Sequence, residues 1–135
     1  MTDLEKENNL TAAPFDTPCT VDELGTSAAH FGRMNDPTSS AVVVGPCGDM
    51  MEFYLVIENN IITDIRFYTE GCLPTVACGE IVSRLAENKT VSDSLSISPL
   101  KVMKSIADLP DSHSHCPILA VSSLYKAVAT YMLMY

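Results

Sequence analysis

Three consecutive strand-like runs between residues 40 and 68 constrain the fold more than any other feature of the sequence. The first, Ala41-Val42-Val43-Val44, is β-branched and stops at Gly45-Pro46. Residues 50–58 and 61–68 are rich in apolar, aromatic and β-branched types, and Asn59-Asn60 separates them. An Asn-Asn pair tolerates the positive φ angles of a two-residue hairpin. The runs therefore predict a three-stranded antiparallel meander.

After residue 72 the apolar pattern changes to a helical period. Three helices are predicted, the second starting at the cap Ser98-Pro99 and the third at Pro117, and helices in this arrangement cover one face of a small sheet. We therefore expect an α+β fold with a three-stranded antiparallel sheet and its helices packed on one face. The inward-facing residues predicted for the three helices are Cys78, Ile81, Val82 and Leu85, then Val102, Met103 and Ile106, then Ile118, Val121, Tyr125, Val128 and Met132.

The N-terminal region differs from the rest of the chain. Residues 1–19 are polar and acidic and have no periodic apolar pattern, which predicts a flexible tail. Thr20-Val21-Asp22-Glu23 matches a capping box and predicts a short helix through about Met34. A chain of 135 residues fits one domain, which we place at residues 20–135.

Composition excludes several classes of function. A formal charge of −9 repels phosphate backbones, and the eight basic residues are scattered, so nucleic-acid binding is not expected. No apolar run approaches the roughly 20 residues that span a bilayer, so no membrane association is expected. The acidic start lacks the features of a secretory signal, and we expect a cytoplasmic protein.

Five cysteines are an odd number for a disulfide framework, and in a reducing compartment they are better interpreted as metal ligands or reactive thiols. No Cys-x-x-Cys pair occurs, so a metal site must be assembled from distant segments. Cys47, Cys72 and Cys116 each lie where an element meets a loop. Two strands run out and back between Cys47 and Cys72, so these two positions should reach the same edge of the sheet.

Each of the three positions offers a reason to hold a thiolate. Cys116 precedes Pro117 and Cys72 lies two residues before Pro74, so both face the positive end of a predicted helix dipole. Cys47 has the backbone N–H groups of Gly48 and Asp49 beside it. Thiolates are the form of cysteine that binds metal.

Three thiolates leave one place in a tetrahedral set, and Asp49 and His115 are both candidates to fill it. Three sulfurs select zinc, copper(I) or iron-sulfur chemistry over calcium and magnesium. A carboxylate or imidazole makes a more exchangeable fourth bond, which suits a site that gives its cluster away. Cys78 is predicted to be a buried small hydrophobe, Cys19 to be incidental and His113 to be a solvated loop residue.

The sequence resembles the NifU/IscU-type iron-sulfur cluster assembly scaffold family from about His30 to the C-terminus. The matching segments, in order, are Pro46-Cys47-Gly48-Asp49-Met50-Met51, Gly71-Cys72, Leu109-Pro110 and His115-Cys116-Pro117-Ile118-Leu119-Ala120.

This resemblance implies the fold of the IscU/NifU N-terminal domain and a scaffold or carrier in place of an enzyme. It implies that Cys47, Cys72 and Cys116 receive sulfide from a cysteine desulfurase and hold a nascent cluster, a 2Fe-2S cluster in preference to 4Fe-4S. Asp49 would assist release to recipient apoproteins, and His115 would be a ligand or proton carrier.

The chain departs from the family at two places. The chaperone-recognition segment Leu-Pro-Pro-Val-Lys is replaced by Leu109-Pro110-Asp111-Ser112-His113, which gives no support for recognition by a specialised Hsp70. Leu73-Pro74 replaces the small residues that often follow the second cysteine.

Two alternatives with zinc stay open. One is a sulfurtransferase resembling the SufU branch, in which Cys47, Asp49, Cys72 and Cys116 hold zinc and one thiolate accepts a persulfide sulfur. The other is a structural zinc module, which the complete-looking core disfavours. A cysteine hydrolase is disfavoured because Cys47 has no histidine nearby in the sequence and adjacent residues such as His115 and Cys116 usually point apart. The sequence leaves open whether the chain forms a homodimer.

Overall fold

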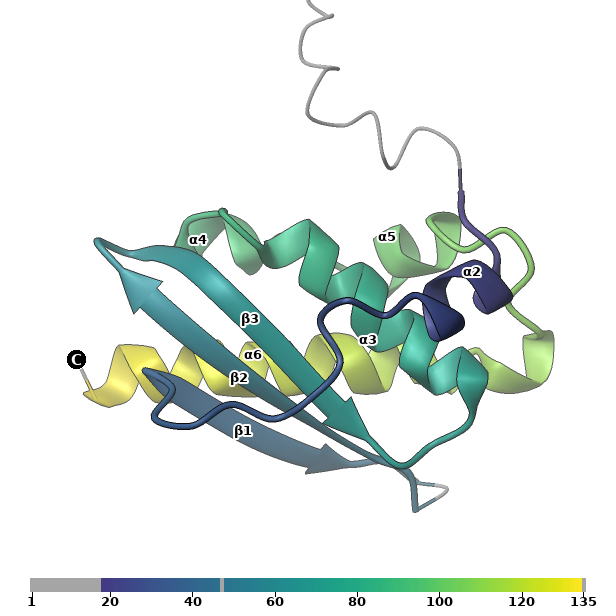
Figure 1. Cartoon of the computed structure of the whole chain (residues 1–135), viewed down its shortest axis with the longest axis horizontal. Coiled ribbons are helices and arrows are strands. Elements are labelled where there is room, and N and C mark those ends of the chain that lie inside the picture. Colours follow the sequence, from purple (N-terminus) through teal and green to yellow (C-terminus); the bar gives the residue numbers. More distant parts are fainter. Residues whose placement is uncertain (1–17, 47, 135) are drawn as a thin grey trace, which may run out of the picture.

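The structure is a computed structural model that describes residues 18–46 and 48–134. Three antiparallel strands form its sheet in the order β1 (Ser39–Val44), β2 (Met50–Glu58) and β3 (Ile61–Thr69) (Figure 1). The predicted meander is confirmed.

The hairpin between β2 and β3 forms as its turn residues predict. Asn59 and Asn60 have φ angles of 55° and 63°, the left-handed conformation that a two-residue hairpin turn requires. Alternate residues of β2 are buried, so one face of the sheet carries the core. Met51 pairs with Val43 on one side and with Thr69 on the other, so the β1–β2 turn and the end of β3 lie at the same edge.

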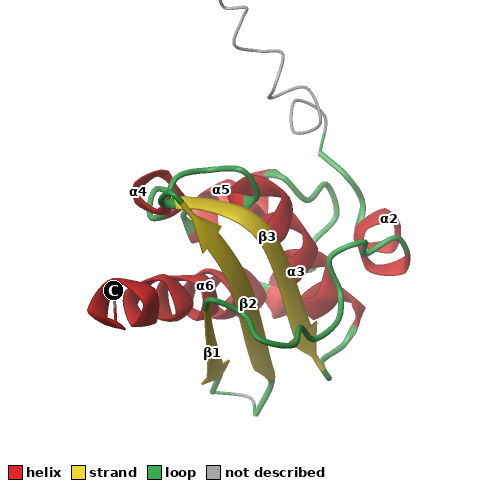
Figure 2. Ribbon diagram, turned by 60° about the vertical axis from the view of Figure 1, so that its left-hand side comes forward, coloured by secondary structure: helices red, strands yellow, loops and turns green. Residues whose placement is uncertain are grey.

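The helices pack on one face of the sheet, with α3 and α6 side by side across it (Figure 2). Helix α3 contacts β3, and helix α6 contacts β1 and β2. The hydrophobic core lies between these helices and the sheet. The helical elements are α2 (Val21–Thr26), α3 (Leu73–Ala86), α4 (Val91–Ser94), α5 (Pro99–Lys104), the 3-10 turn η1 (Asp111–His113) and α6 (His115–Met134).

The first helix is shorter than predicted. The capping box is present, with the Thr20 hydroxyl accepting from the Glu23 N–H and the Glu23 carboxylate accepting from the Thr20 N–H. Helix α2 nevertheless ends at Thr26 because the following chain pairs with the free edge of β3. The Phe67 N–H donates to the His30 carbonyl at 3.0 Å, and the Gly32 N–H donates to the Phe67 carbonyl at 2.7 Å. The predicted extension of this helix to Met34 is therefore wrong.

The last helix begins earlier than predicted and presents a different face. Helix α6 starts at His115, so Cys116 lies in its first turn instead of before it. Ile118 and Met132, predicted inward, are 56% and 57% exposed, and Met103 of α5 is 40% exposed. The residues of α6 that are buried in their place are Leu119, Leu124 and Ala127.

One stretch, Asp111–Met134, has the length and the hydropathy, 1.3, of a helix that could cross a membrane. Half of its most apolar window is buried inside the fold, where α6 packs on β1 and β2. Apolar residues of this helix therefore pack in the core against the sheet.

The start of the described chain is attached to α5. The Cys19 N–H donates to the Ser105 carbonyl at 3.2 Å, and its carbonyl accepts from the Ala107 N–H at 2.8 Å. Residues 1–17, which hold most of the predicted tail, lie outside the described residues, and the tail stays a prediction.

Candidate metal centre

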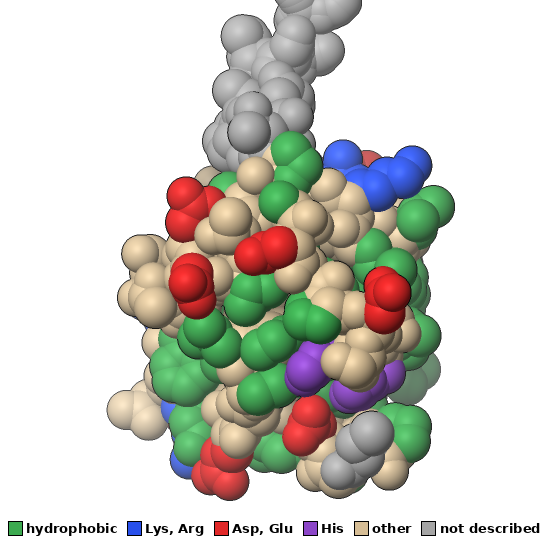
Figure 3. Space-filling model, turned by 90° about the vertical axis from the view of Figure 1, so that its right-hand side faces the viewer, with side chains coloured by type: hydrophobic (Ala, Val, Ile, Leu, Met, Phe, Trp, Pro, Cys, Tyr) green, Lys and Arg blue, Asp and Glu red, His purple; other side chains and the backbone are tan. Residues whose placement is uncertain are grey.

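One end of the molecule gathers three junctions between elements. The β1–β2 turn, the passage from β3 into α3 and the start of α6 all lie at the right-hand end of Figure 1. Figure 3 views this end directly and shows histidine side chains beside an acidic one, among apolar side chains. Of the predicted ligands, Asp49, Cys72, His115 and Cys116 lie here, whereas Cys47 lies outside the described residues.

Asp49 is placed by the turn that follows β1. The Gly45 N–H donates to the Asp49 carbonyl at 2.7 Å, and the Gly48 N–H donates to the Gly45 carbonyl at 3.0 Å. Gly48 has a φ of 87°, which favours glycine at this position. The turn brings Asp49 Oδ2 to 3.9 Å from His115 Nε2, an ion pair when the imidazole is protonated.

Cys72 occupies the N-cap position of α3. Its φ and ψ are −73° and 176°, and its carbonyl accepts from the N–H groups of Thr75 and Val76 at 3.0 and 3.1 Å. Pro74 sits in the first turn, as predicted. The residue is exposed, so its sulfur can be reached from solution at the positive end of the helix dipole.

Cys116 is fully buried, yet it is connected to the exposed cysteine. Its sulfur lies 3.4 Å from the Thr75 hydroxyl, and the same hydroxyl lies 3.5 Å from the Cys72 sulfur. His115 Nε2 is 3.8 Å from the Cys116 sulfur. A continuous series of polar contacts thus runs from Asp49 through His115, Cys116 and Thr75 to Cys72.

The surroundings of Cys116 favour its thiolate. A hydrogen bond with the Cys78 thiol, a second with the Thr75 hydroxyl and the nearby His115 and His113 rings lower the pKa of Cys116 to about 6, although burial opposes the shift. The same hydrogen bond and burial raise the pKa of Cys78 well above its usual range. Of the two neighbouring thiols, Cys116 therefore ionises first and Cys78 keeps its proton.

His113, predicted as a solvated loop residue, lies beside the site. Its ring stacks on that of His115, with 6.1 Å between centroids and 22° between planes. The Ser112 hydroxyl is 3.2 Å from its Nδ1. His113 therefore contacts His115 of the candidate site as well as its own loop.

The donor types at this end fit a soft metal ion. Two sulfurs, an imidazole and a carboxylate suit zinc or iron, with the oxygen or nitrogen as the more labile ligand. Within residues 18–46 and 48–134, no three histidine, cysteine or acidic side chains are gathered closely enough to hold an ion between them. The described part of the site is a row of contacting donors, next to the turn that contains position 47.

One member of the row, Thr75, and one neighbour of it, Cys78, were not predicted to take part in the site. Thr75 was not singled out, and Cys78 was predicted only to be a buried side chain, which it is, without its contact to Cys116. A signal was present, because Cys72, Thr75 and Cys78 are spaced three residues apart and so follow one face of a helix.

The fold and the sulfur-containing end define a class of small α+β proteins, and comparisons identify the family within it. Residues 21–134 match the model of the NifU-like N-terminal domain. The chain belongs to this family. Since the match spans most of the chain, the earlier resemblance to NifU/IscU-type proteins is confirmed.

Relatives and solved structures agree with this assignment. The iron-sulfur cluster assembly scaffold protein IscU 1 of Archaeoglobus fulgidus is 33% identical over 103 residues, which are 76% of this chain and 67% of that protein. Iron sulfur cluster assembly protein 1 of Trachipleistophora hominis is 32% identical over 117 residues, 87% of this chain and 80% of that protein.

Among solved structures, an N-terminal NifU-like protein from Brucella abortus superposes with a TM-score of 0.72 at 14% identity, covering 93% of this chain and 99% of that one. A candidate SUF-system scaffold for iron-sulfur cluster assembly from Fervidobacterium islandicum AW-1 gives 0.68 at 13% identity, covering 80% and 93%. At these identities the likeness concerns the fold.

Proposed function

We propose that this chain is a scaffold on which an iron-sulfur cluster is assembled and from which it is passed to recipient apoproteins. Relatives such as IscU 1 carry the name of cluster assembly scaffold, which supports a carrier in place of an enzyme. Cys47, Cys72 and Cys116 would hold the cluster, with Asp49 or His115 as the fourth ligand. The cytoplasm, whose thiols are kept reduced, is the compartment we assign to this chemistry.

The observation that carries this proposal is the pairing of an exposed and a buried sulfur at two helix starts. Cys72 is accessible, whereas Cys116 is buried, with a pKa of about 6, and is therefore largely ionised at neutral pH. Metal capture needs thiolates, and an accessible sulfur beside an ionised one gives an arriving iron ion both entry and a strong first bond. Iron and sulfide are the cargo here, and a cysteine desulfurase is the proposed source of the sulfur.

Cluster assembly without partners tests the proposal. Anaerobic incubation of the metal-free protein with ferrous iron and sulfide should give a brown product with sulfur-to-iron charge-transfer bands, and we expect a 2Fe-2S spectrum. Cys72→Ser and Cys116→Ser should lose the bands. Cys19→Ser is the matched control, because the backbone of Cys19 pairs with the chain after α5 and Cys19 takes no part in the contacts described for the site, so the bands should not change. A colourless wild-type product would contradict the scaffold function.

A second candidate is favoured by the exposure of Cys72. In a zinc-bound sulfurtransferase, the Cys72 thiolate attacks the terminal sulfur of the desulfurase persulfide. This forms a Cys72 persulfide and releases the desulfurase thiolate, while the other ligands hold zinc. Protein isolated anaerobically without added metal would then contain zinc and no sulfide, and it would stimulate desulfurase turnover. A scaffold would instead be isolated with iron and acid-labile sulfide, or would acquire them.

A further inference from the structure

Thr75 differs from the other buried hydroxyl groups of the described chain in what it contacts. It is fully buried in the first turn of α3, and its hydroxyl lies against two sulfurs, at 3.5 Å from Cys72 and 3.4 Å from Cys116. The other buried serine and threonine hydroxyls between residues 18 and 134 donate to backbone carbonyls: Ser39, Thr69, Ser83, Ser94, Ser105 and Ser123.

The Thr75 side chain packs directly against the backbone of Gly71, which precedes α3. A Cβ atom added at Gly71 would lie 2.9 Å from both Cβ and Oγ1 of Thr75 and 3.0 Å from its Cγ2. Gly71 has no positive φ among the described backbone angles, so space, and not conformation, accounts for glycine here. The Thr75 side chain is therefore held between the Gly71 backbone and the two sulfurs.

The hydroxyl can serve both sulfurs together. A threonine hydroxyl carries one donor and two acceptor positions, so it donates to one sulfur while it accepts from the other thiol. Cys116 is also fixed by burial, but the exposed Cys72 has no other side-chain partner among its described hydrogen bonds. The rotamer of Cys72 therefore depends on Thr75.

We propose that Thr75 is a positioning residue of the metal centre, which fixes the Cys72 and Cys116 sulfurs relative to each other so that one ion or cluster meets both. The proposal rests on the proposed function for the identity of the cargo. Partners that orient metal ligands typically contribute about 10- to 100-fold to metal affinity. Thr75 would have this effect without itself binding the metal.

Two measurements on three variants test the role. Thr75→Val removes the hydroxyl at nearly constant shape, Thr75→Ser keeps it, and Gly71→Ala displaces it. Thr130→Val is the matched control, because the Thr130 hydroxyl bonds to the Lys126 carbonyl in α6, remote from the α6 start. The first measurement is the χ1 coupling of Cys72 by NMR in metal-free protein. The second is titration with cobalt(II), read from the thiolate-to-cobalt charge-transfer band and the unfolding free energy.

The expected pattern is specific. Thr75→Val and Gly71→Ala should show rotamer averaging at Cys72 and cobalt binding weaker by about 10- to 100-fold, with a diminished band. Thr75→Ser and Thr130→Val should match the wild type. If Thr75→Val does not fold, Thr75→Ala carries the same expectation.

An unchanged Cys72 coupling together with unchanged cobalt affinity in Thr75→Val would overturn the positioning role. A wild-type protein with no thiolate-cobalt band would instead count against the proposed function. The coupling, measured without metal, would still decide the role of Thr75.

Discussion

At the scale of single residues, Cys72 and Cys116, the two described cysteines proposed as metal ligands, differ in exposure and in surroundings. Cys72 is exposed and is oriented by one hydroxyl, whereas Cys116 is buried and is surrounded by Thr75, Cys78 and His115. In the proposed scaffold, the exposed sulfur of Cys72 would be reached first by an arriving ion, and the buried sulfur of Cys116 would help to hold it. In the proposed scaffold, release would depend on the candidate fourth ligands Asp49 and His115, whose side chains are 30% and 29% exposed.

Asp49→Ala should slow the delivery of a cluster to a recipient. A carboxylate oxygen is a hard ligand that binds a soft site weakly, so it provides the bond that opens first. We expect transfer from the loaded protein to a 2Fe-2S apo-ferredoxin, followed by circular dichroism, to slow by about 10-fold. Asp64→Ala is the control, because Asp64 is an exposed β3 carboxylate next to Arg66. Transfer at the wild-type rate or faster would refute the role of Asp49.

Local residue chemistry explains which parts of the site could be predicted. Gly45-Pro46 and Pro74 mark where elements stop and start, so the sequence alone places Asp49 and Cys72 at one edge of the sheet. The contact of Thr75 with Cys116 spans 41 residues and depends on how α3 packs against α6. No local pattern encodes that packing, so the hydroxyl between the sulfurs is visible only in three dimensions.

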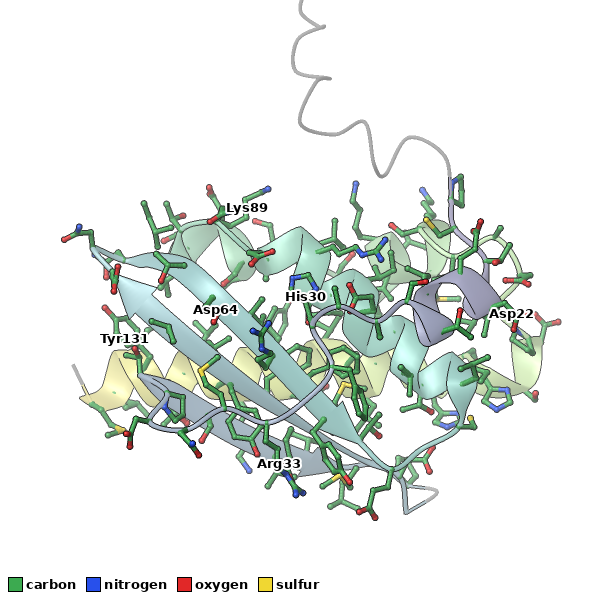
Figure 4. The ribbon with its side chains drawn as sticks, in the orientation of Figure 1. Asp22, His30, Arg33, Asp64, Lys89 and Tyr131 are labelled. Carbon is green, nitrogen blue, oxygen red and sulfur yellow. The ribbon has the colours of Figure 1, made fainter. Side chains whose placement is uncertain are left out.

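At the scale of elements, a buried ion cluster attaches the segment between α2 and β1 to α3. Figure 4 shows His30 between that segment and the helix. His30 Nδ1 lies 2.8 Å from Glu80 Oε2, and its Nε2 lies 2.8 Å from Glu87 Oε1. Ionised carboxylates only accept, so with both partners ionised each ring nitrogen donates, which favours the imidazolium form of His30. Glu80, fully buried, also accepts from the His30 N–H and from Arg84.

The pKa values of the cluster follow from these contacts. The hydrogen bond to Glu80 raises the pKa of His30 above 6.5, against burial and with help from Glu87. Burial alone would raise the pKa of Glu80, but hydrogen bonds from His30 and Arg84 outweigh it and lower the pKa below 4.5. A raised histidine pKa means that the stabilisation is complete below 6.5 and is lost as pH rises through the folded value.

His30→Gln should therefore destabilise the protein in a pH-dependent way. At a pH near or just below the unperturbed histidine pKa, we expect the variant to lose about 1–3 kcal/mol of unfolding free energy relative to the wild type. Near pH ~9 the loss should be smaller. Denaturant unfolding of the wild type and the variant across this pH range measures the difference between their unfolding free energies. The Cys116 titration occurs in both proteins and cancels in the difference. Thr130→Val, which changes no titratable group, is the control, and its difference from the wild type in unfolding free energy should stay constant with pH. A difference that stays constant with pH for His30→Gln would contradict the imidazolium.

Two features of the helices were predicted wrongly because contacts between distant residues decide them: which face of α6 is buried and where α2 ends. Ile118-Leu119-Ala120-Val121 is apolar at every position, so the sequence does not show which side of α6 faces the sheet. The segment after Thr26 leaves the helix because its backbone pairs with the edge of β3. The His30 N–H in this segment also donates to Glu80, which lies 50 residues further along the chain. The β2–β3 hairpin, set by Asn59-Asn60 and the alternating burial of β2, was predictable because its information is local.

At the scale of the whole molecule, the core and the metal centre are nearly separate. The largest fully buried side chains come from the inner face of β2 and β3 and from the helices, and they include Phe53, Phe67, Leu55, Ile65 and Leu124. The candidate ligands that the structure describes lie at one end of this core, and of these Cys116 alone belongs to it. The apolar core is therefore formed by side chains that are mostly separate from the candidate ligands.

Removal of metal should leave the fold intact, which separates a scaffold from a structural zinc module. In zinc modules the ion supplies on the order of 10 kcal/mol of folding energy, so chelation unfolds them. Here we expect the chelated protein to keep its far-ultraviolet circular dichroism and a cooperative thermal transition. Added metal should raise the unfolding free energy only by linkage, about 2.7 kcal/mol at a free concentration 100 times Kd. Cys72→Ser/Cys116→Ser should match the chelated wild type and show no metal-dependent gain. Loss of the cooperative transition on chelation would instead make the ion part of the fold.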